Sequence, residues 1–322
     1  MQNISSQGKL AFVFPGQGSQ AVAMLSDFAQ NETVQSTFKE ASDALGYDLW
    51  QLIAQGPVEK LNKTNHTQPA LLTASVALWR VWQEESDVMP CVLAGHSLGE
   101  YSALVCADVI SLTDGVKLVE KRGEYMQACV PAGVGAMAAV IGLDDQAIID
   151  ACAQAQDSHQ VKEVVAAVNF NSPGQVVIAG HKAAVERAGE LCKTAGAKRV
   201  LPLPVSVPSH CALMSDAADK LATDLESITF NTPTINVVNN VDVLIETSGE
   251  AIKTALVKQL YSPVRWSETI TLLGEQGITQ MVEVGPGKVL QGLVKRINKS
   301  ISCVSFNNED TLAKAKELTQ ES

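Results

Sequence analysis

The sequence lacks the features that mark several large functional classes. No apolar run approaches the roughly 20 residues that span a bilayer, and the amino terminus has no basic segment followed by a long apolar stretch. We therefore expect no signal peptide and no membrane partner. No Lys/Arg-rich run interrupts a formal net charge of -11 at pH 7, which argues against a nucleic-acid partner.

Cysteines are few and scattered. There are seven, an odd number without a CxxC pair, and the five histidines do not cluster with them. Structural zinc sites are built from such pairs and clusters, so we expect no metal and no cofactor. Free thiols are typical of a reducing compartment, which predicts a cytoplasmic protein.

What the sequence does contain is material for a large core, since 46% of the residues are hydrophobic and 18% charged. Short buried strands at 9–14, 91–94, 235–239 and 281–284 alternate with helical patterns. This alternation predicts an α/β fold with a mostly parallel sheet that helices cover on both faces. Two helix starts are also expected: Pro69 as the first residue of a helix at 69–85, and Thr113 as the N-cap of a helix at 114–129.

The middle of the chain has a different pattern. Between 133 and 205 the expected order is β-α-β-β-α-β, which is typical of a ferredoxin-like unit. We therefore predict a large α/β domain formed by residues 1–132 and 206–322, with a small inserted subdomain at 133–205.

Residues 95–99, GHSLG, fit the pattern G-x-S-x-G. An expected strand precedes them and an apolar helix follows, which is the setting of a nucleophile elbow. Such a turn holds its serine in a strained conformation, and the helix N-terminus favours developing negative charge. The alternative is a serine that only caps an ordinary helix, which would explain neither flanking glycine. Ser97 is therefore the predicted nucleophile.

A serine nucleophile needs a base, and the histidines are the candidates. His96 adjoins Ser97, so its side chain should point elsewhere, while His66, His159 and His181 are expected at the surface or in caps. His210 ends a segment with three prolines in seven residues, and such a stiff segment suits a catalytic imidazole. A histidine that merely packs at a domain junction is the alternative.

Acyl transfer passes through an oxyanion, which two backbone N–H groups stabilise. The N–H of Leu98, directly after the serine, is one donor by geometry. The glycine-flanked turn at 16–18 could supply the second. A phosphate-binding loop or a simple tight turn are the alternatives, although the stretch lacks the Lys-Ser/Thr of a P-loop.

Arg122 shares a helical stripe with Leu118, Tyr125 and Cys129, which predicts that it faces inward. A buried guanidinium cannot lose its proton and needs an anion. That anion is either a structural Asp or Glu, or a substrate carboxylate held by a bidentate fork.

Together these motifs resemble the malonyl-CoA:acyl carrier protein transacylases of bacterial fatty acid synthesis. The resemblance runs from about residue 9 to residue 297, with motifs in the family's order. The matching stretches are FVFPGQGSQ (12–20), AGHSLGEYSAL (94–104), VEKRGEYMQ (119–127), GAMAAV (135–140), NFNSPGQVVIAG (169–180), VSVPSHCALM (205–214), VVNNVD (237–242), QLYSPVRW (259–266) and EVGPGKVL (283–290).

The resemblance implies a hydrolase-like α/β domain with a ferredoxin-like insert, malonyl-CoA as donor and acyl carrier protein as a transient partner. It implies these roles: Ser97 as nucleophile, His210 as its base, the N–H groups of Gln17 and Leu98 as oxyanion hole, Arg122 as carboxylate binder, and Gln259 at the position whose backbone carbonyl orients the histidine. Ser209, before the histidine, favours the stand-alone enzyme, because the acyltransferase domains of polyketide synthases often carry an aromatic residue there.

Three alternatives remain at this point. A trans-acting acyltransferase of a polyketide assembly line would use the same chemistry with a different carrier. A serine esterase would use the same elbow without needing Arg122. A non-catalytic docking domain would be expected to have lost part of the set formed by Ser97, His210 and Gln17.

Overall fold

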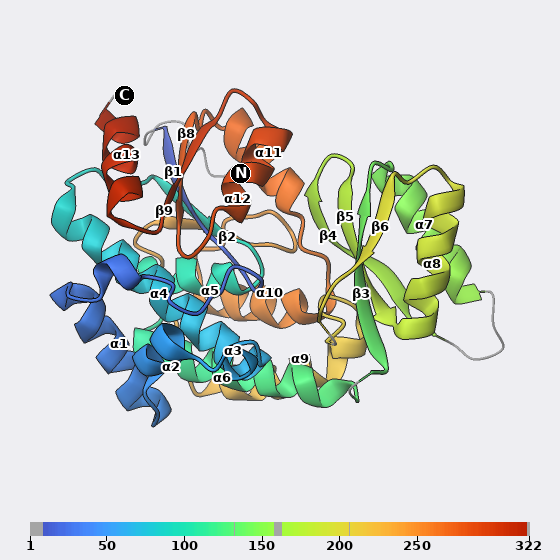
Figure 1. Cartoon of the computed structure of the whole chain (residues 1–322), viewed down its shortest axis with the longest axis horizontal. Coiled ribbons are helices and arrows are strands. Elements are labelled where there is room, and N and C mark those ends of the chain that lie inside the picture. The colour runs from blue at the N-terminus through green and yellow to red at the C-terminus, as the bar shows by residue number, and fades with distance from the viewer. Residues whose placement is uncertain (1–8, 132, 158–162, 206, 321–322) are drawn as a thin grey trace.

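The computed structural model describes residues 9–131, 133–157, 163–205 and 207–320. Residues 1–8, for which no signal peptide is expected, lie outside these ranges. Two sheets organise the chain, and Figure 1 shows the smaller one in the part at the right end and the larger one in the body to its left. In the described part, no helix is both long and apolar enough to cross a membrane.

The larger sheet has five parallel strands in the order β7-β2-β1-β8-β9. They are β1 (Leu10–Phe14), β2 (Val92–Gly95), β7 (Asn236–Val238), β8 (Gln280–Val284) and β9 (Ser302–Phe306). Every residue of the central strand β1 is buried, as helices on both faces of a parallel sheet require. The predicted parallel α/β sheet is confirmed.

Apolar side chains of β1 point alternately to the two faces of this sheet, and each face has its own core. Phe12 and Phe14 belong to the larger core cluster, whereas Ala11 and Val13 belong to the other. The helices around the sheet are α1 (Glu32–Leu45), α2 (Leu49–Gln55), α3 (Val58–Leu61), α4 (Thr64–Glu85), α5 (Leu98–Cys106), α6 (Leu112–Cys129), α9 (Ser215–Glu226), α10 (Gly249–Tyr261), α11 (Trp266–Glu275), α12 (Val289–Ile297) and α13 (Glu309–Gln320), with short 3-10 turns η2 (Ser26–Phe28) and η3 (Ala212–Met214).

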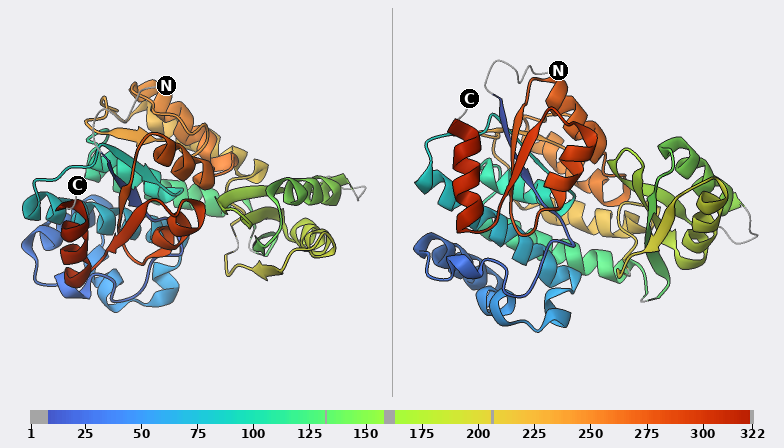
Figure 2. Two further views of the ribbon diagram at one scale, coloured as in Figure 1. Left: turned by 90° about the horizontal axis from the view of Figure 1, so that it is seen from above. Right: turned by 45° about the horizontal axis from the view of Figure 1, so that its top comes forward.

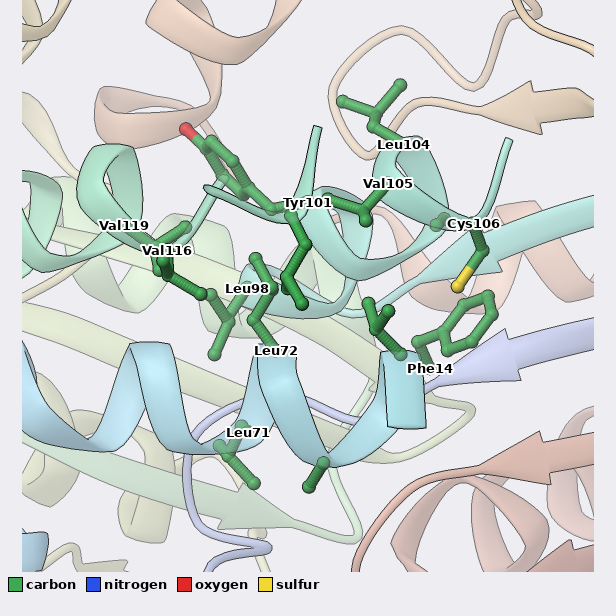
Figure 3. Close-up of a cluster of buried hydrophobic side chains, with 14 of the residues drawn as sticks. Phe14, Leu71, Leu72, Leu98, Tyr101, Leu104, Val105, Cys106, Val116 and Val119 are labelled. Atoms are coloured by element: carbon green, nitrogen blue, oxygen red, sulfur yellow. The ribbon is translucent and has the colours of Figure 1, made fainter. Parts of the chain in front are cut away.

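Helix α5 is buried along its whole length. Figure 3 shows its residues Leu98 and Tyr101 among side chains of α4 and α6, such as Leu72 and Val116. Because α5 starts directly after Ser97, this packing fixes the turn that carries the serine.

The smaller sheet is antiparallel, with strand order β4-β5-β3-β6. Its elements follow in the order β3 (Gly135–Ile141), α7 (Asp145–Asp157), β4 (Val165–Ser172), β5 (Gln175–His181), α8 (Lys182–Thr194) and β6 (Arg199–Pro202). Side chains of α7 and α8 form one apolar cluster with the sheet. The predicted ferredoxin-like arrangement is confirmed, and Figure 2 shows it standing beside the larger body. Residues 132 and 206, where the predicted domain boundaries fall, lie outside the described ranges, so the division into domains stays a prediction.

Strand β4 also links the two parts of the molecule. The backbone N–H of Phe170 donates to the carbonyl of Val264 (3.0 Å), and the N–H of Val264 donates to Val168 (2.8 Å). Val264 lies just before α11 in the larger part. The small sheet is therefore tied by backbone hydrogen bonds to the segment that follows α10.

The prediction that Pro69 starts a helix is wrong, because α4 begins at Thr64 and Pro69 lies inside it. The hydroxyl of Thr67 donates to the carbonyl of Leu61 (2.6 Å) and holds this first turn. Gly123 of α6 lies directly against it, since a Cβ at Gly123 would come within 2.6 Å of the Asn65 Cα. Pro69 has no N–H, so the helix lacks one backbone hydrogen bond there. The contacts of Thr67 and Gly123 stabilise the first turn of α4 in spite of this loss.

The predicted start of α6 is also wrong. The helix begins at Leu112, and Ser111 is its N-cap, with its hydroxyl accepting from the N–H of Asp114 (3.0 Å). Thr113, the predicted cap, lies within the helix. Sequence spacing allowed either residue, because serine and threonine both cap helices well.

Ser111→Ala should therefore lower the free energy of unfolding by about 1 kcal/mol, the usual value of a lost N-cap. Thr113→Ala is the matched control, and it should change stability little because Thr113 makes no cap bond. Urea unfolding of the two variants checks this. Equal losses in both variants would contradict the assignment of Ser111 as the cap.

Candidate active site

Ser97 occupies a strained turn between β2 and α5. Its backbone has φ 53° and ψ -107°, in a region that residues other than glycine rarely adopt. Two glycines make the turn possible. A Cβ at Gly95 would lie 1.8 Å from the carbonyl carbon of Gly99, and a Cβ at Gly99 would lie 2.0 Å from the Phe14 carbonyl oxygen.

Asn240, which follows β7, holds the same turn from the side. Its Oδ1 accepts from the N–H of Ser97 (2.7 Å), and its Nδ2 donates to the carbonyl of Gly95 (2.6 Å). One amide therefore bridges both sides of the turn. This bridge helps to offset the strain that φ 53° imposes on Ser97.

His210 lies against the serine. Its Nε2 is 2.7 Å from Ser97 Oγ, and its Nδ1 is 2.8 Å from the backbone carbonyl of Gln259. A carbonyl only accepts hydrogen bonds, so the proton of the neutral imidazole sits on Nδ1, and Nε2 is the acceptor that faces the hydroxyl. The imidazole is buried. Burial, and after it the charge of Arg122, lowers the pKa of His210 to about 3.

The other histidines have different partners. His96 Nε2 lies 2.7 Å from Asn171 Oδ1, so the side chain points toward the end of β4. His66, expected at the surface or in a cap, lies in the first turn of α4. His181 Nδ1 accepts from the N–H of Val164 (2.9 Å), and His159 lies outside the described residues. Of the described histidines, His210 is the one that contacts Ser97.

Arg122 is 1% exposed and aims its guanidinium at the same point. Nη1 donates to Gln68 Oε1 (2.7 Å), while Nη2 donates to Gln259 Oε1 (2.9 Å) and lies 3.4 Å from Ser97 Oγ. Among the described residues, no carboxylate forms an ion pair with this guanidinium. A buried cation whose direct partners are neutral is suited to receive an incoming anion.

A cavity of about 210 Å³ opens over these groups. Ser97, His210 and Arg122 line it, together with Gln17 and Leu98. Within the described residues, the backbone N–H groups of Gln17 and Leu98 donate to no acceptor. The structure thus brings five of the six predicted site residues to one cavity, and Gln259 lies directly behind them.

Three residues of this arrangement were not singled out from the sequence: Gln68, Glu100 and Asn240. Gln68 directly precedes Pro69, the predicted helix start. Asn240 sits in a pair of asparagines at the end of β7, and Glu100 is a charge inside a nearly all-apolar helix. A charge or amide in a buried stretch is the signal that could have indicated each of them.

Comparison with known proteins agrees with this geometry. The family described as acyl transferase domain matches residues 11–316. A protein of Escherichia coli strain K12 named malonyl CoA-acyl carrier protein transacylase is 62% identical over 311 residues, which cover 96% of this chain and 99% of that protein. The protein of the same name from Bacillus subtilis is 43% identical and covers 97% of this chain and 98% of its own.

Solved structures agree as well. The acyl carrier protein S-malonyltransferase of Vibrio cholerae superposes with a TM-score of 0.92 at 62% identity, covering 95% of this chain and 99% of that one. A second structure, of a type II PKS acyl-carrier protein in complex with its malonyl-transacylase, has a TM-score of 0.94 at 59% identity, covering 96% and 99%.

The low pKa of His210 predicts how the serine responds to pH. The imidazole should stay neutral, and able to accept the Ser97 proton, well below its ordinary pKa of about 6.5. Labelling of Ser97 by a fluorophosphonate should therefore keep most of its rate down to about pH 5. A rate that halves near pH 6.5 would contradict the burial argument.

Proposed function

The chain belongs to the acyl transferase family, and we propose that it transfers a malonyl group from malonyl-CoA to the phosphopantetheine thiol of acyl carrier protein. The group would pass through an ester on Ser97. The observation that carries the proposal is Arg122, a buried cation that forms no direct ion pair with any described carboxylate and lies 3.4 Å from the serine oxygen. The names of the relatives, which span nearly the whole chain, support the same substrates.

In the first half-reaction, the malonyl carboxylate binds Arg122 and brings the thioester carbonyl to Ser97. His210 Nε2 takes the hydroxyl proton as Oγ attacks the carbonyl carbon. The backbone N–H groups of Gln17 and Leu98 stabilise the oxyanion, and loss of one such donor typically costs about 2.7–4 kcal/mol. The C–S bond then breaks, and His210 returns the proton to the sulfur of coenzyme A.

In the second half-reaction, the carrier thiol enters the same cavity. His210 takes its proton, the sulfur attacks the ester carbonyl, and Ser97 leaves with the proton that His210 held. Malonyl is then a thioester of the carrier. Two substrates that visit one serine in turn should show ping-pong kinetics.

Gln259 is proposed to orient the base. Its carbonyl accepts from His210 Nδ1 (2.8 Å), the position that a carboxylate occupies in a serine-histidine-aspartate triad. This bond selects the tautomer with a free Nε2. No acid is needed for that selection, because a carbonyl fixes the proton as well as a carboxylate does.

A polyketide assembly line is the second candidate user of this chemistry. The support is the structure of a malonyl-transacylase 59% identical to this chain, which is described in complex with a type II PKS acyl-carrier protein. The chemistry at Ser97 would be the same, and only the carrier would differ. A serine esterase is less well supported, because hydrolysis of simple esters gives no use for the buried guanidinium of Arg122.

We also propose that residues 133–205 act as a subdomain of their own, inserted between 1–132 and 206–322. The support is that the four-stranded sheet has its own apolar cluster with α7 and α8. A cytoplasmic location is proposed on the substrates and on the seven cysteines, all of which are free thiols.

Ser97→Ala should abolish covalent labelling by malonyl-CoA, because among the described residues of the cavity Ser97 is the one whose hydroxyl is hydrogen-bonded to His210 Nε2. Mass spectrometry of the intact protein after mixing with malonyl-CoA measures this. Ser209→Ala is the matched control, since Ser209 also lines the cavity and its hydroxyl donates to Met137 Sδ (3.6 Å) instead of contacting His210. Malonyl that still lands on Ser97→Ala would refute the seryl ester.

Arg122→Ala should lower kcat/KM for malonyl-CoA by on the order of 100-fold, because a charge-assisted contact to the carboxylate is lost. The value for acetyl-CoA should fall much less. Arg122→Lys keeps the positive charge but cannot form the two parallel hydrogen bonds of a guanidinium. Its kcat/KM for malonyl-CoA should lie between those of the unmodified protein and of Arg122→Ala. An equal fall in kcat/KM for malonyl-CoA and for acetyl-CoA would mean that Arg122 only supports the structure.

A further inference from the structure

Glu100 is an acid that the reaction as described does not use. It lies on α5, one turn after Ser97, and is 2% exposed. Among the residues that the structure describes, no Lys or Arg forms an ion pair with it. A buried carboxylate without a direct cation is rare, because burial removes it from water at a cost in free energy. The groups that stabilise Glu100 therefore need to be identified.

The partners of Glu100 lead to Arg122. Its Oε2 accepts from the backbone N–H of Asn240 (3.0 Å) and from Nε2 of Gln259 (2.8 Å). The other end of the same amide, Gln259 Oε1, accepts from Arg122 Nη2 (2.9 Å). One side-chain amide therefore separates the buried anion from the buried cation, with its dipole aligned to both.

This juxtaposition balances two charges that would otherwise be isolated. An amide between a carboxylate and a guanidinium keeps them close enough to attract through a medium of low polarity, yet leaves the guanidinium free on its cavity side. We propose that Glu100 is the built-in counter-charge of Arg122, acting across the Gln259 amide, and that it limits how tightly the site holds a substrate carboxylate. The inference rests on the proposed function, since it names what tunes the malonyl contact.

The consequence is a site that binds an anion without trapping it. With Glu100 ionised, a malonyl carboxylate is a second anion sharing one cation, so the attraction to Arg122 is reduced. A bare buried guanidinium would hold the malonyl carboxylate more strongly and slow its departure with the carrier. Glu100 is thus a positioning residue for specificity, and it does not touch the substrate.

The isosteric variant Glu100→Gln isolates the charge. Its Oε1 can still accept from Asn240 and Gln259, so the amide chain keeps its direction, while the negative charge is removed. At about pH 8, KM for malonyl-CoA should fall about fivefold and KM for acetyl-CoA should stay unchanged. The maximal rate of malonyl transfer to the carrier should fall. A residue that only supports the fold would not tighten one substrate selectively.

Glu283→Gln is the matched control. Glu283 is equally buried, and its carboxylate accepts from the N–H groups of Leu290 (3.0 Å) and Gln291 (2.7 Å) at the start of α12. Its loss should lower stability without changing the ratio of the two KM values. A change in this ratio as large as that of Glu100→Gln would overturn the proposal, as would an unchanged or raised KM for malonyl-CoA in Glu100→Gln.

The unmodified protein offers a second measurement if Glu100→Gln does not fold. Burial, the largest cause, raises the pKa of Glu100 to about 7, against the hydrogen bonds from Gln259 and Asn240 and the charge of Arg122. Among the described residues, Tyr101 on the same helix and Glu246, which shares a small cavity with Glu100, are the other titratable groups near it. Lowering the pH from about 8 to about 6 should protonate Glu100 and lower KM for malonyl-CoA relative to KM for acetyl-CoA.

The ratio of the two KM values cancels effects that both acyl-CoA substrates share, including titration of His210 and of the coenzyme A phosphates. A ratio that stays constant or moves toward acetyl-CoA at low pH would overturn the proposal. Failure of the proposed function has a different signature, because malonyl would then not appear on Ser97 at all.

Discussion

The carboxyl-terminal turn of α10 connects Ser97, His210 and Arg122. The last carbonyls of a helix have no partner within the helix. Here His210 satisfies two of them, since its Nδ1 bonds to Gln259 and its backbone N–H donates to Leu260 (3.0 Å). The side chain of Gln259 bonds to the Ser97 carbonyl (3.0 Å) and to Arg122. The helix end therefore fixes the position of the imidazole relative to both other groups.

Strain at the site is held by these same contacts. Ser97 and His210 both have positive φ, at 53° and 65°, and each such residue costs of order 1–3 kcal/mol. The bonds from Asn240 to the serine turn and from α10 to His210 stabilise the two conformations. Helix α5, which starts directly after Ser97, is buried against α4 and α6 and holds the turn from its helical side (Figure 3). The rigid core thus keeps the two side chains 2.7 Å apart before any substrate arrives.

How much the sequence predicts depends on whether the signal is local. The elbow could be predicted because its glycines, strand and helix are contiguous, and the ferredoxin-like unit because its elements follow one another in order. The first turn of α4 could not, since the packing of Gly123 against Asn65 joins distant segments. The hydrogen-bond chain from Glu100 through Gln259 to Arg122 could not be predicted either, because its three residues lie on three different helices.

The orientation of His210 by a carbonyl also bears on why transfer should win over hydrolysis. A carboxylate partner would stabilise the imidazolium, whereas here a neutral carbonyl faces Nδ1 and a guanidinium lies nearby. The resulting weak base can still accept a proton from a thiol, whose pKa is about 8.5. Water, with a pKa of about 15.7, gives up its proton far less readily to the same base. The proposed malonyl ester would therefore persist in the cavity until a carrier thiol arrives. The Ser97 hydroxyl holds its proton about as tightly as water does, and it can still react because the structure fixes its Oγ 2.7 Å from His210 Nε2.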